Sequence, residues 1–342
     1  MTFLVLAVIV LFVLAGVRVM SIAALSAELR SSRKDETITD AENRSQGNMW
    51  VIFLVAFFGF CYWQFISYKD KILPEAASAH GPEIDKLFYI TLALITIVFI
   101  GTHIIMVYQT YNYAGKKGNR ATYFAHSNKL ELVWTVIPAV VLSGLIAYGL
   151  TVWNDVIYPG DKKAMVVELY SKQFDWTARY AGKDNQLGRY DFRSIGTGND
   201  LGLLEDAKND DDVIVKGEMH LLLGEPVQFK FRSRDVIHSA YMPHFRAQMN
   251  CVPGMETMFE FTPTITTSQM REKLNNPKFN YILLCNKICG ASHFNMQMDI
   301  IVDTKEEFAK WMSEQKTWAQ TQSASKQTAS AITPVAENTS SN

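Results

Sequence analysis

The sequence of 342 residues has few cysteines, few histidines and almost no net charge. Its 33 lysines and arginines are balanced by 34 acidic residues, which gives a formal net charge of −1. Nucleic-acid binding needs a basic surplus to neutralise phosphates, so this composition argues against such a partner. The chain has 4 cysteines and 7 histidines, and no C-x-x-C-H segment occurs. We therefore expect no covalently attached haem c.

Long apolar runs, in contrast, are abundant in the first half of the chain. A helix needs about 20 mostly apolar residues to cross a bilayer. Runs near residues 49–67, 87–108 and 132–153 meet this requirement, and a further run near 3–25 is interrupted by Arg18. This first run could instead be a cleaved signal peptide, but it lacks the positively charged start of such peptides. We interpret it as a retained span, so the sequence predicts four transmembrane helices.

The basic residues of the loops predict the orientation of these helices. Residues 26–48 and residues 109–130 each contain four lysines or arginines. Both loops would lie on the same side of a four-span protein, and the positive-inside tendency makes that side cytoplasmic. The loop at 69–86 and the chain after residue 153 would then face outward.

After the last span, short β-rich segments replace the long apolar runs. Segments such as AMVVELYSKQFDWTARY and VIVKGEMHLLLGEPVQFKFRS are separated by Gly, Pro, Asn and Asp. This spacing predicts an all-β sandwich or barrel. Residues 196–212 are acidic and Gly-rich, which predicts a solvated loop. Thr304 and Glu307 form a capping-box pattern that predicts a short helix through Trp311.

These features divide the chain into four parts. An N-terminal pair of spans with its cytoplasmic loop occupies residues 1–68, and a transmembrane hairpin occupies 69–153. The outer β domain follows at 154–316. Residues 317–342 consist mainly of Ser, Thr, Ala and Gln with almost no bulky apolar residues, so we expect a disordered tail.

Four potential metal ligands lie within twelve residues near the end of the β domain. The segment LLCNKICGASHFNM contains Cys285, Cys289, His293 and Met296, and His238 follows a predicted strand in DVIHS. Thiolate, imidazole and thioether together favour copper, whereas structural zinc rarely uses methionine. One copper ion with a single cysteine is the mononuclear electron-transfer pattern. Two cysteines can bridge two copper ions, with one histidine left for each, and such a centre transfers electrons without bond chemistry.

A disulfide between Cys285 and Cys289 is the main alternative, because the domain faces outward. His293 and Met296 would then be ordinary surface or core residues. Four donors at this spacing, with a separate histidine loop, favour the metal site. The two remaining cysteines do not compete, since one lies in a predicted span and the other stands alone.

Over roughly residues 80–312, the chain resembles subunit II of the bacterial haem–copper cytochrome c oxidases. KLELVWTVIP resembles the family's E-x-x-W-T-x-I-P stretch, and DVIHS and CNKICGASHFNM resemble its two copper loops. The resemblance implies a membrane-anchored α plus all-β fold, in which transmembrane helices precede a cupredoxin-like Greek-key β-barrel. It also implies a multi-pass protein of the bacterial inner membrane, with the copper domain on the periplasmic side.

The resemblance further implies a dinuclear copper centre, CuA, with six contributing residues: His238, Cys285, Lys287, Cys289, His293 and Met296. The two cysteines would bridge both ions. His238 and Met296 would complete the coordination of one ion. His293 and the backbone carbonyl of Lys287 would complete that of the other. Electrons from cytochrome c, or from a cytochrome c domain, would pass to haem in subunit I, where oxygen is reduced and protons are pumped. The implied partners are therefore this donor, subunit I, other oxidase subunits and membrane lipid.

Four further residues resemble functional positions of the family outside the ligand set. Phe174 and Trp176 lie in SKQFDW, which resembles the aromatic stretch that receives electrons, with Phe174 at the position usually held by tryptophan. Asp235 resembles a carboxylate that helps to dock cationic cytochrome c. Glu131 resembles a carboxylate at the entrance of a proton path into subunit I. The alternatives are packing at the barrel edge for the aromatics and simple solvation for the carboxylates.

Two positions depart from the family pattern. Lys287 stands where the family usually has a glutamate that helps to bind magnesium at the interface with subunit I, and Asn250 stands where aspartate is usual. An ammonium group cannot ligate a cation, so the sequence puts magnesium in question while the copper ligands stay intact. The two N-terminal spans also exceed the usual hairpin, and we expect them to pack against neighbouring subunits.

Three other classes of protein were weighed against this interpretation. A quinol-oxidase subunit II shares the fold but lacks the copper ligands, all of which are present here. Nitrous oxide reductase uses the same copper motif but needs a large histidine-rich catalytic domain, for which this chain has no room. A copper-delivery protein binds one exchangeable copper, whereas these ligands indicate a permanent site. We therefore expect an electron-accepting oxidase subunit that houses no oxygen chemistry of its own.

Overall fold

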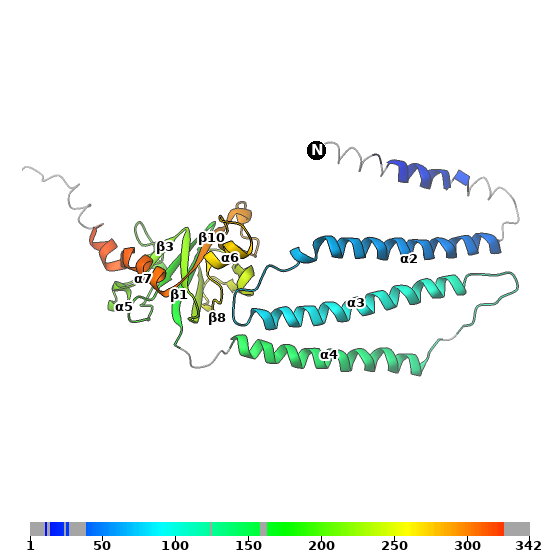
Figure 1. Ribbon diagram of the computed structural model, residues 1–342, viewed down its shortest axis with the longest axis horizontal. Helices are drawn as coiled ribbons and strands as arrows, with labels where there is room; N and C mark the ends of the chain where they lie inside the picture. The colour runs from blue at the N-terminus through cyan, green and yellow to red at the C-terminus, as the bar shows by residue number, and fades with distance from the viewer. Residues whose placement is uncertain are drawn as a thin grey trace, which may run out of the picture. The chain divides into compact units, whose positions relative to one another are not determined.

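The structure, a computed structural model shown in Figure 1, describes residues 11, 14–23, 25–26, 39–123, 125–157 and 163–324. The chain divides into two compact units. The first comprises Met1–Tyr68 and Ile95–Ser127, and the second comprises Lys69–Leu94 and Asn128–Asn342.

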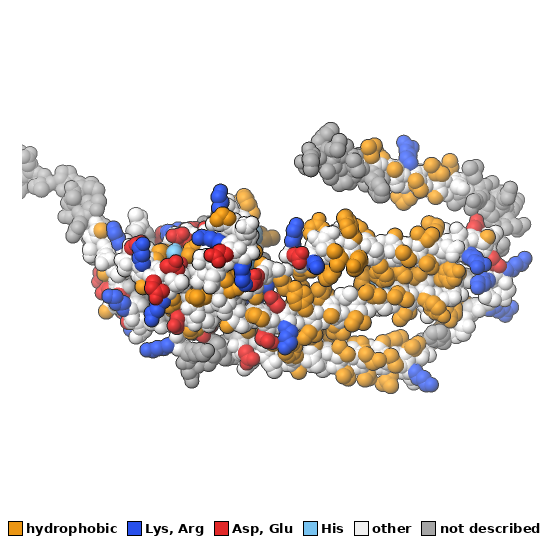
Figure 2. All heavy atoms as spheres, viewed as in Figure 1, with side chains coloured by type: hydrophobic (Ala, Val, Ile, Leu, Met, Phe, Trp, Pro, Cys, Tyr) orange, Lys and Arg blue, Asp and Glu red, His pale blue; other side chains and the backbone are white. Residues whose placement is uncertain are grey.

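Three long helices confirm three of the predicted spans: α2 (Asp40–Tyr68), α3 (Gly81–Asn112) and α4 (Asn128–Ile157). Each is long and apolar enough to cross a bilayer. Figure 2 shows hydrophobic side chains over their surfaces. Contact of such apolar surfaces with lipid is favourable, whereas their exposure to water is not. The first predicted span lies largely outside the described residues, of which Leu14–Ala23 form a short apolar helix.

Within the first unit, α2 packs against the second half of α3 through aromatic rings. The ring centroid of Phe57 lies 5.9 Å from that of Phe99 and 5.8 Å from that of His103. Nδ1 of His103 is 2.8 Å from the carbonyl oxygen of Phe99. The imidazole therefore has a hydrogen-bonding partner within its own helix and needs none from lipid.

The second unit contains two five-stranded sheets, ordered β3-β2-β1-β5-β8 and β4-β10-β9-β6-β7. The strands are β1 (Met165–Lys172), β2 (Asp175–Tyr180), β3 (Val213–Lys216), β4 (Glu218–Leu222), β5 (Val227–Ser233), β6 (His238–Met242), β7 (Ala247–Cys251), β8 (Thr257–Phe261), β9 (Tyr281–Cys285) and β10 (Gln297–Asp303). The short helices are α5 (Ala207–Asp210), α6 (Thr267–Lys273) and α7 (Lys305–Glu314). The β1–β5 and β4–β10 pairs are parallel and the other pairs are antiparallel. The predicted all-β domain is confirmed, and α7 begins at the predicted capping box.

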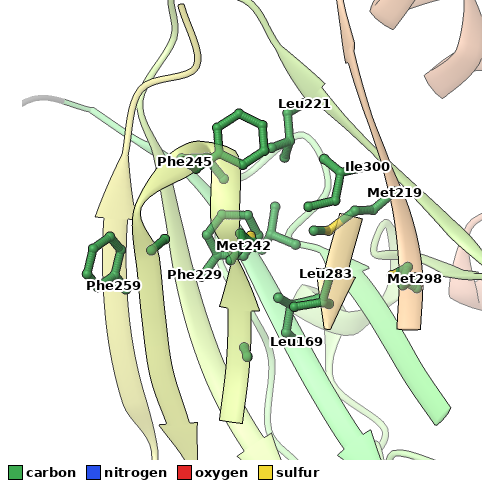
Figure 3. Close-up of a cluster of buried hydrophobic side chains, with 14 of the residues drawn as sticks. Leu169, Met219, Leu221, Phe229, Met242, Phe245, Phe259, Leu283, Met298 and Ile300 are labelled. Carbon is green, nitrogen blue, oxygen red and sulfur yellow. The ribbon is translucent and has the colours of Figure 1, made fainter. Parts of the chain in front are cut away.

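The core of the β domain lies between the two sheets. Alternation along the strands directs Leu169 and Phe229 of the first sheet toward Leu283 and Ile300 of the second, as Figure 3 shows. All four side chains are fully buried. Burial of such a side chain stabilises the fold by about 1.5–3 kcal/mol. This core therefore fixes the strand ends from which the loops of the site project.

The acidic insertion is not the solvated loop that its composition predicts. Leu201 and Leu203 pack with Tyr170 against the outer face of the first sheet, and Asn209 and Asp212 are fully buried. The insertion therefore forms a cover over this face. One of its acidic residues, Asp212, pairs with a buried arginine instead of being solvated.

A buried arginine explains why the insertion folds inward. Arg179 of β2 donates through Nε to Asp212 Oδ2 at 2.6 Å and through Nη2 to Asn209 Oδ1 at 2.5 Å. Its Nη1 lies 3.2 Å from Glu168 Oε2, and Arg232 donates to the other oxygen of Glu168. Burial favours a raised pKa for Glu168, but the pairs with Arg232 and Arg179 lower it overall. A buried guanidinium requires such partners.

The first residues of the predicted tail are held against the β domain. Residues 317–324 are ordered, with Thr317 in a β-bridge to Val213 and residues 318–324 helical. Trp318 packs against the cluster on the outer face of the first sheet. One large aromatic side chain thus anchors a segment whose composition is otherwise typical of a tail. Residues 325–342 lie outside the described residues.

The segment that precedes α3 is docked onto the β domain. Ser78 Oγ donates to the carbonyl oxygen of Phe245 at 2.8 Å. Arg246 Nε donates to Asp85 Oδ1, in α3, at 2.6 Å. The start of α3 is therefore joined to the β domain by hydrogen bonds and by an ion pair.

His244 should make the stability of this junction depend on pH. Its ring packs against Phe279 and Tyr281, with centroids 5.1 and 5.3 Å away. Burial, together with the nearby Arg246, lowers the pKa of His244 from 6.5 to about 4. Because the folded pKa is depressed, the stabilising contribution is complete above pH 6.5 and is lost as the pH falls toward 4.

We therefore expect the midpoint of thermal unfolding of the β domain to fall between pH 7 and pH 5. His244→Phe keeps an aromatic ring at the position but cannot be protonated, so its midpoint should fall less. Calorimetry of the full-length chain in detergent would measure how the unfolding midpoint changes with pH in the wild type and in His244→Phe. An equal change in the two proteins would contradict the assignment to His244.

Candidate metal centre

The side-chain donors that the sequence analysis grouped together meet at one end of the β domain. Cys285 ends β9, His238 begins β6, and Met296 immediately precedes β10. His293 begins the short turn η4 (His293–Asn295), and Cys289 lies in the loop between β9 and this turn. Because β9 lies between β6 and β10 in the second sheet, the sheet itself brings these strand ends together.

The two cysteine sulfurs form the middle of the cluster. The Sγ atoms of Cys285 and Cys289 are 3.8 Å apart, and both cysteines are free. The structure therefore does not contain the disulfide of the alternative interpretation. The carbonyl oxygen of Lys287 lies 3.2 Å from Cys285 Sγ, so the backbone between the cysteines also faces the cluster.

Imidazole and thioether groups flank the two sulfurs. Nδ1 of His238 lies 3.8 Å from Sγ of Cys285. Nδ1 of His293 lies 3.6 Å, and Sδ of Met296 3.8 Å, from Sγ of Cys289. Each sulfur thus has its own histidine, and the ligating atoms of His238 and the two cysteines all lie within 4.8 Å of one another.

The surroundings of the cluster favour a bound cation. Cys289 and Met296 are buried, and His238 is completely buried. Burial, together with the neighbouring Cys285, raises the pKa of the Cys289 thiol to about 11. Two adjacent thiolates therefore need a metal to be stable at neutral pH. Two sulfurs, a thioether and imidazoles are soft or borderline ligands, and this donor set fits copper.

Asp235 supports one of the histidines, a role that the sequence analysis missed. Asp235 Oδ1 lies 2.9 Å from Nε2 of His238, and its two oxygens accept the N–H groups of Gln173 and Val236 at 2.8 Å. Burial favours a raised pKa for Asp235, but these hydrogen bonds lower it overall. The carboxylate holds the proton on Nε2, which leaves Nδ1 free for a metal. The D-x-x-H spacing was the available signal.

We expect Asp235→Ala to weaken copper retention about 10- to 100-fold, as is usual when the partner of a ligating histidine is lost. Competition with a chelator would measure the loss. Glu272→Ala, at an exposed carboxylate of α6, is the matched control and should retain copper. If Asp235 serves only to dock a donor protein, its variant will retain copper as well as this control does.

Phe174 lies against the loop that carries the second cysteine. A Cβ atom added to Gly290 would come within 2.9–3.0 Å of ring carbons of Phe174, so the ring covers this glycine beside Cys289. Gln173 Nε2 donates to the carbonyl oxygen of Cys289 and fixes the same turn. Phe174 is only partly buried, so a partner protein can reach it.

Trp176, the other predicted electron-input residue, occupies a different kind of position. It is fully buried, its Nε1 donates to the carbonyl oxygen of Met296 at 3.5 Å, and its ring lies edge-on to His238 at 6.2 Å. A donor protein cannot touch it. β2 directs this side chain into the core, and its role in electron input stays a prediction.

The residues near Lys287 do not fit magnesium. Asn250 pairs with Ser239 across β6 and β7, and the N–H of Asn286 donates to the carbonyl oxygen of the same serine at 2.9 Å. The exposed side chains of Asn250, Asn286 and Lys287 end in two amides and an ammonium group. Magnesium is bound through carboxylate oxygens, and none of these side chains supplies one.

Glu131 lies apart from the cluster. It is exposed in the first turn of α4, where a carboxylate also interacts favourably with the helix macrodipole. The structure brings Glu131 to none of the copper donors, and its role in proton uptake stays a prediction.

Comparisons with known proteins agree with these observations. The family model for the transmembrane domain of cytochrome c oxidase subunit II matches residues 61–152. The alternative cytochrome c oxidase subunit 2 of Bradyrhizobium diazoefficiens is 36% identical over 239 residues, which cover 69% of this chain and 81% of that protein. Cytochrome c oxidase subunit 2 of Thermostichus vulcanus is 29% identical over 283 residues, which cover 73% and 80%.

Among solved structures, the periplasmic domain of subunit II of cytochrome oxidase from Bradyrhizobium japonicum matches 45% of this chain and 94% of its own, at 17% identity and a TM-score of 0.32. The expected order of apolar helices followed by an all-β domain is confirmed by the structure and by the family model. The chain is 36% identical to a curated relative and covers 81% of its length. It therefore belongs to the cytochrome c oxidase subunit II family, as a membrane-bound subunit of a terminal oxidoreductase.

Proposed function

We propose that this chain is the electron-accepting subunit of its oxidase and that the β domain holds a dinuclear CuA centre. The observation that carries the proposal is the pair of cysteine sulfurs 3.8 Å apart, each with its own histidine Nδ1 within 3.8 Å. A mononuclear copper site uses one cysteine and leaves no role for a second. When bound, such a centre takes up and releases one electron that both ions share.

The protein's contribution is to hold these ligands still. Cys285 and Cys289 would bridge both ions, with His238 and Met296 on one and His293 with the Lys287 carbonyl on the other. Strand ends and the Asp235 hydrogen bonds fix the ligands, and the burial of His238, both cysteines and Met296 limits the access of water. A rigid, dry site needs little rearrangement when its charge changes, and this permits fast electron transfer.

Electrons would arrive from cytochrome c, or from a cytochrome c domain, at the surface beside Phe174. They would leave for haem in subunit I, where oxygen is reduced and protons are pumped. Glu131 would lie at the entrance of a proton path into that subunit. The basic loops support a position of the β domain on the periplasmic side of the bacterial inner membrane, because positively charged loops tend to stay in the cytoplasm.

The site of electron input can be tested with Phe174→Ala. We expect reduction of copper by cytochrome c to slow about tenfold, because truncation of a central aromatic contact typically costs more than 1 kcal/mol. Stopped-flow absorbance on the intact oxidase would measure the rate. Phe192→Ala removes a more exposed aromatic side chain, 70% accessible, and should leave the rate unchanged.

Two further readings complete this test. A small reductant such as ascorbate with tetramethylphenylenediamine should reduce both variants at the wild-type rate, because it needs no docking surface. With a cationic cytochrome c, the rate should fall as salt rises, since exposed carboxylates steer such a donor. A rate insensitive to salt would favour a donor tethered within a larger assembly. Equal cytochrome c rates in the two variants would argue against input at Phe174.

A further inference from the structure

Lys287 is an exposed cation without an ion-pair partner in the part of the chain that the structure describes. Its carbonyl oxygen faces Cys285, so its backbone is committed to the cluster while its side chain is exposed. Ser239, Asn250 and Asn286 beside it are neutral. This surface therefore carries one uncompensated positive charge.

The same loop carries the two most exposed large apolar side chains of the described β domain. Ile288 and Phe294 are each 85% exposed. A large apolar side chain that a rigid loop exposes to this extent commonly marks a surface that another protein covers. Ile288 directly follows Lys287 in the chain, so a protein that covers Ile288 would lie within reach of the long Lys287 side chain.

We propose that Lys287 forms an ion pair with a carboxylate of the oxidase subunit that covers this loop. The inference rests on the proposed place of the chain in the oxidase. Where the family pattern has glutamate and aspartate, this chain has Lys287 and Asn250, so two negative charges are removed and one positive charge is added. A divalent cation would now be repelled, and the ammonium itself supplies positive charge to the partner's carboxylate.

The experiment uses the intact oxidase, purified from cells grown with Mn²⁺, which substitutes for magnesium and is visible by electron paramagnetic resonance. Lys287→Gln should increase the fraction of this chain lost in a salt wash about tenfold, because it leaves the partner's carboxylate without a counter-charge. Lys287→Arg should retain the chain as the wild type does. Lys278→Gln, at an exposed lysine distant in sequence from the copper loops, is the matched control.

A gain-of-site variant tests the other half of the proposal. The double variant Lys287→Glu, Asn250→Asp should bind one Mn²⁺ more than the wild type. The wild type itself should lose neither activity nor thermal stability when it is treated with a chelator selective for hard cations. The proposal would be overturned if the wild type contained a Mn²⁺ ion that is lost in Lys287→Gln. It would also be overturned if the Lys287→Gln chain were fully retained in the salt wash. The copper spectrum is recorded in parallel: its absence from the wild type would overturn the proposed function and not the ion pair.

Discussion

Cys289→Ser should lose the dinuclear centre while the β domain stays folded. The two cysteine sulfurs lie 3.8 Å apart, and each has a histidine Nδ1 within 3.8 Å, so two bridging thiolates would be needed to hold two ions between the histidines; a hydroxyl oxygen is a poor substitute for a soft thiolate. The full-length wild-type chain in detergent should bind two copper ions, with the spectrum of one electron shared by both. The variant should bind at most one, and the sharing should disappear from the electron paramagnetic resonance spectrum.

The matched control is Cys251→Ser. Cys251 is also buried and pairs directly with His238 across β6 and β7, but its sulfur is not among the donor atoms that flank the histidines. Its replacement should leave the copper count and the spectrum unchanged, apart from some loss of stability. One copper in the wild type, or a shared electron that survives in Cys289→Ser, would show that the two cysteines do not bridge.

The second large effect is expected from Arg179→Met. Methionine fills a similar space but leaves Asp212 buried without its counter-charge and Glu168 with Arg232 alone, and loss of one partner of a buried ion pair typically costs about 3–5 kcal/mol. The insertion should detach first, because Asp212 and Asn209 are the residues through which Arg179 holds it. Thermal unfolding and limited proteolysis within residues 187–212 would measure the loss.

Arg189→Met provides the comparison for this prediction. Arg189 precedes the insertion and pairs with Asp206 within it at 3.2 Å, but its side chain is 74% exposed. An exposed pair contributes about 0–1 kcal/mol, so this variant should unfold close to the wild type. Equal midpoints for the two variants would show that the buried network does not hold the insertion in place.

Local patterns predicted the parts of this protein that local chemistry determines. Three apolar runs became α2, α3 and α4, and Thr304 with Glu307 started α7. The copper loops could be recognised because Cys285, Cys289 and His293 lie within one short segment, so chain connectivity alone keeps their side chains close.

The features that could not be predicted depend on pairing between distant segments. Nothing near Arg179 in the sequence shows that Asp212, 33 positions away, will be its partner. Composition therefore predicted a solvated insertion, whereas in the fold Asp212 of the insertion is the buried counter-charge of Arg179. The sequence likewise does not show that both faces of β2 are covered, with Trp176 in the core between the sheets and Arg179 against the insertion.

The docked segment before α3 has a consequence for how the copper donors are presented. Because Ser78 and Asp85 are bonded to the β domain, the domain does not swing on a flexible tether above the lipid. The β domain and the start of α3 form one body. If the proposed function holds, every donor molecule would meet the copper donors in the same orientation relative to the start of this helix, and the electron would have one path length to cover instead of a broad distribution.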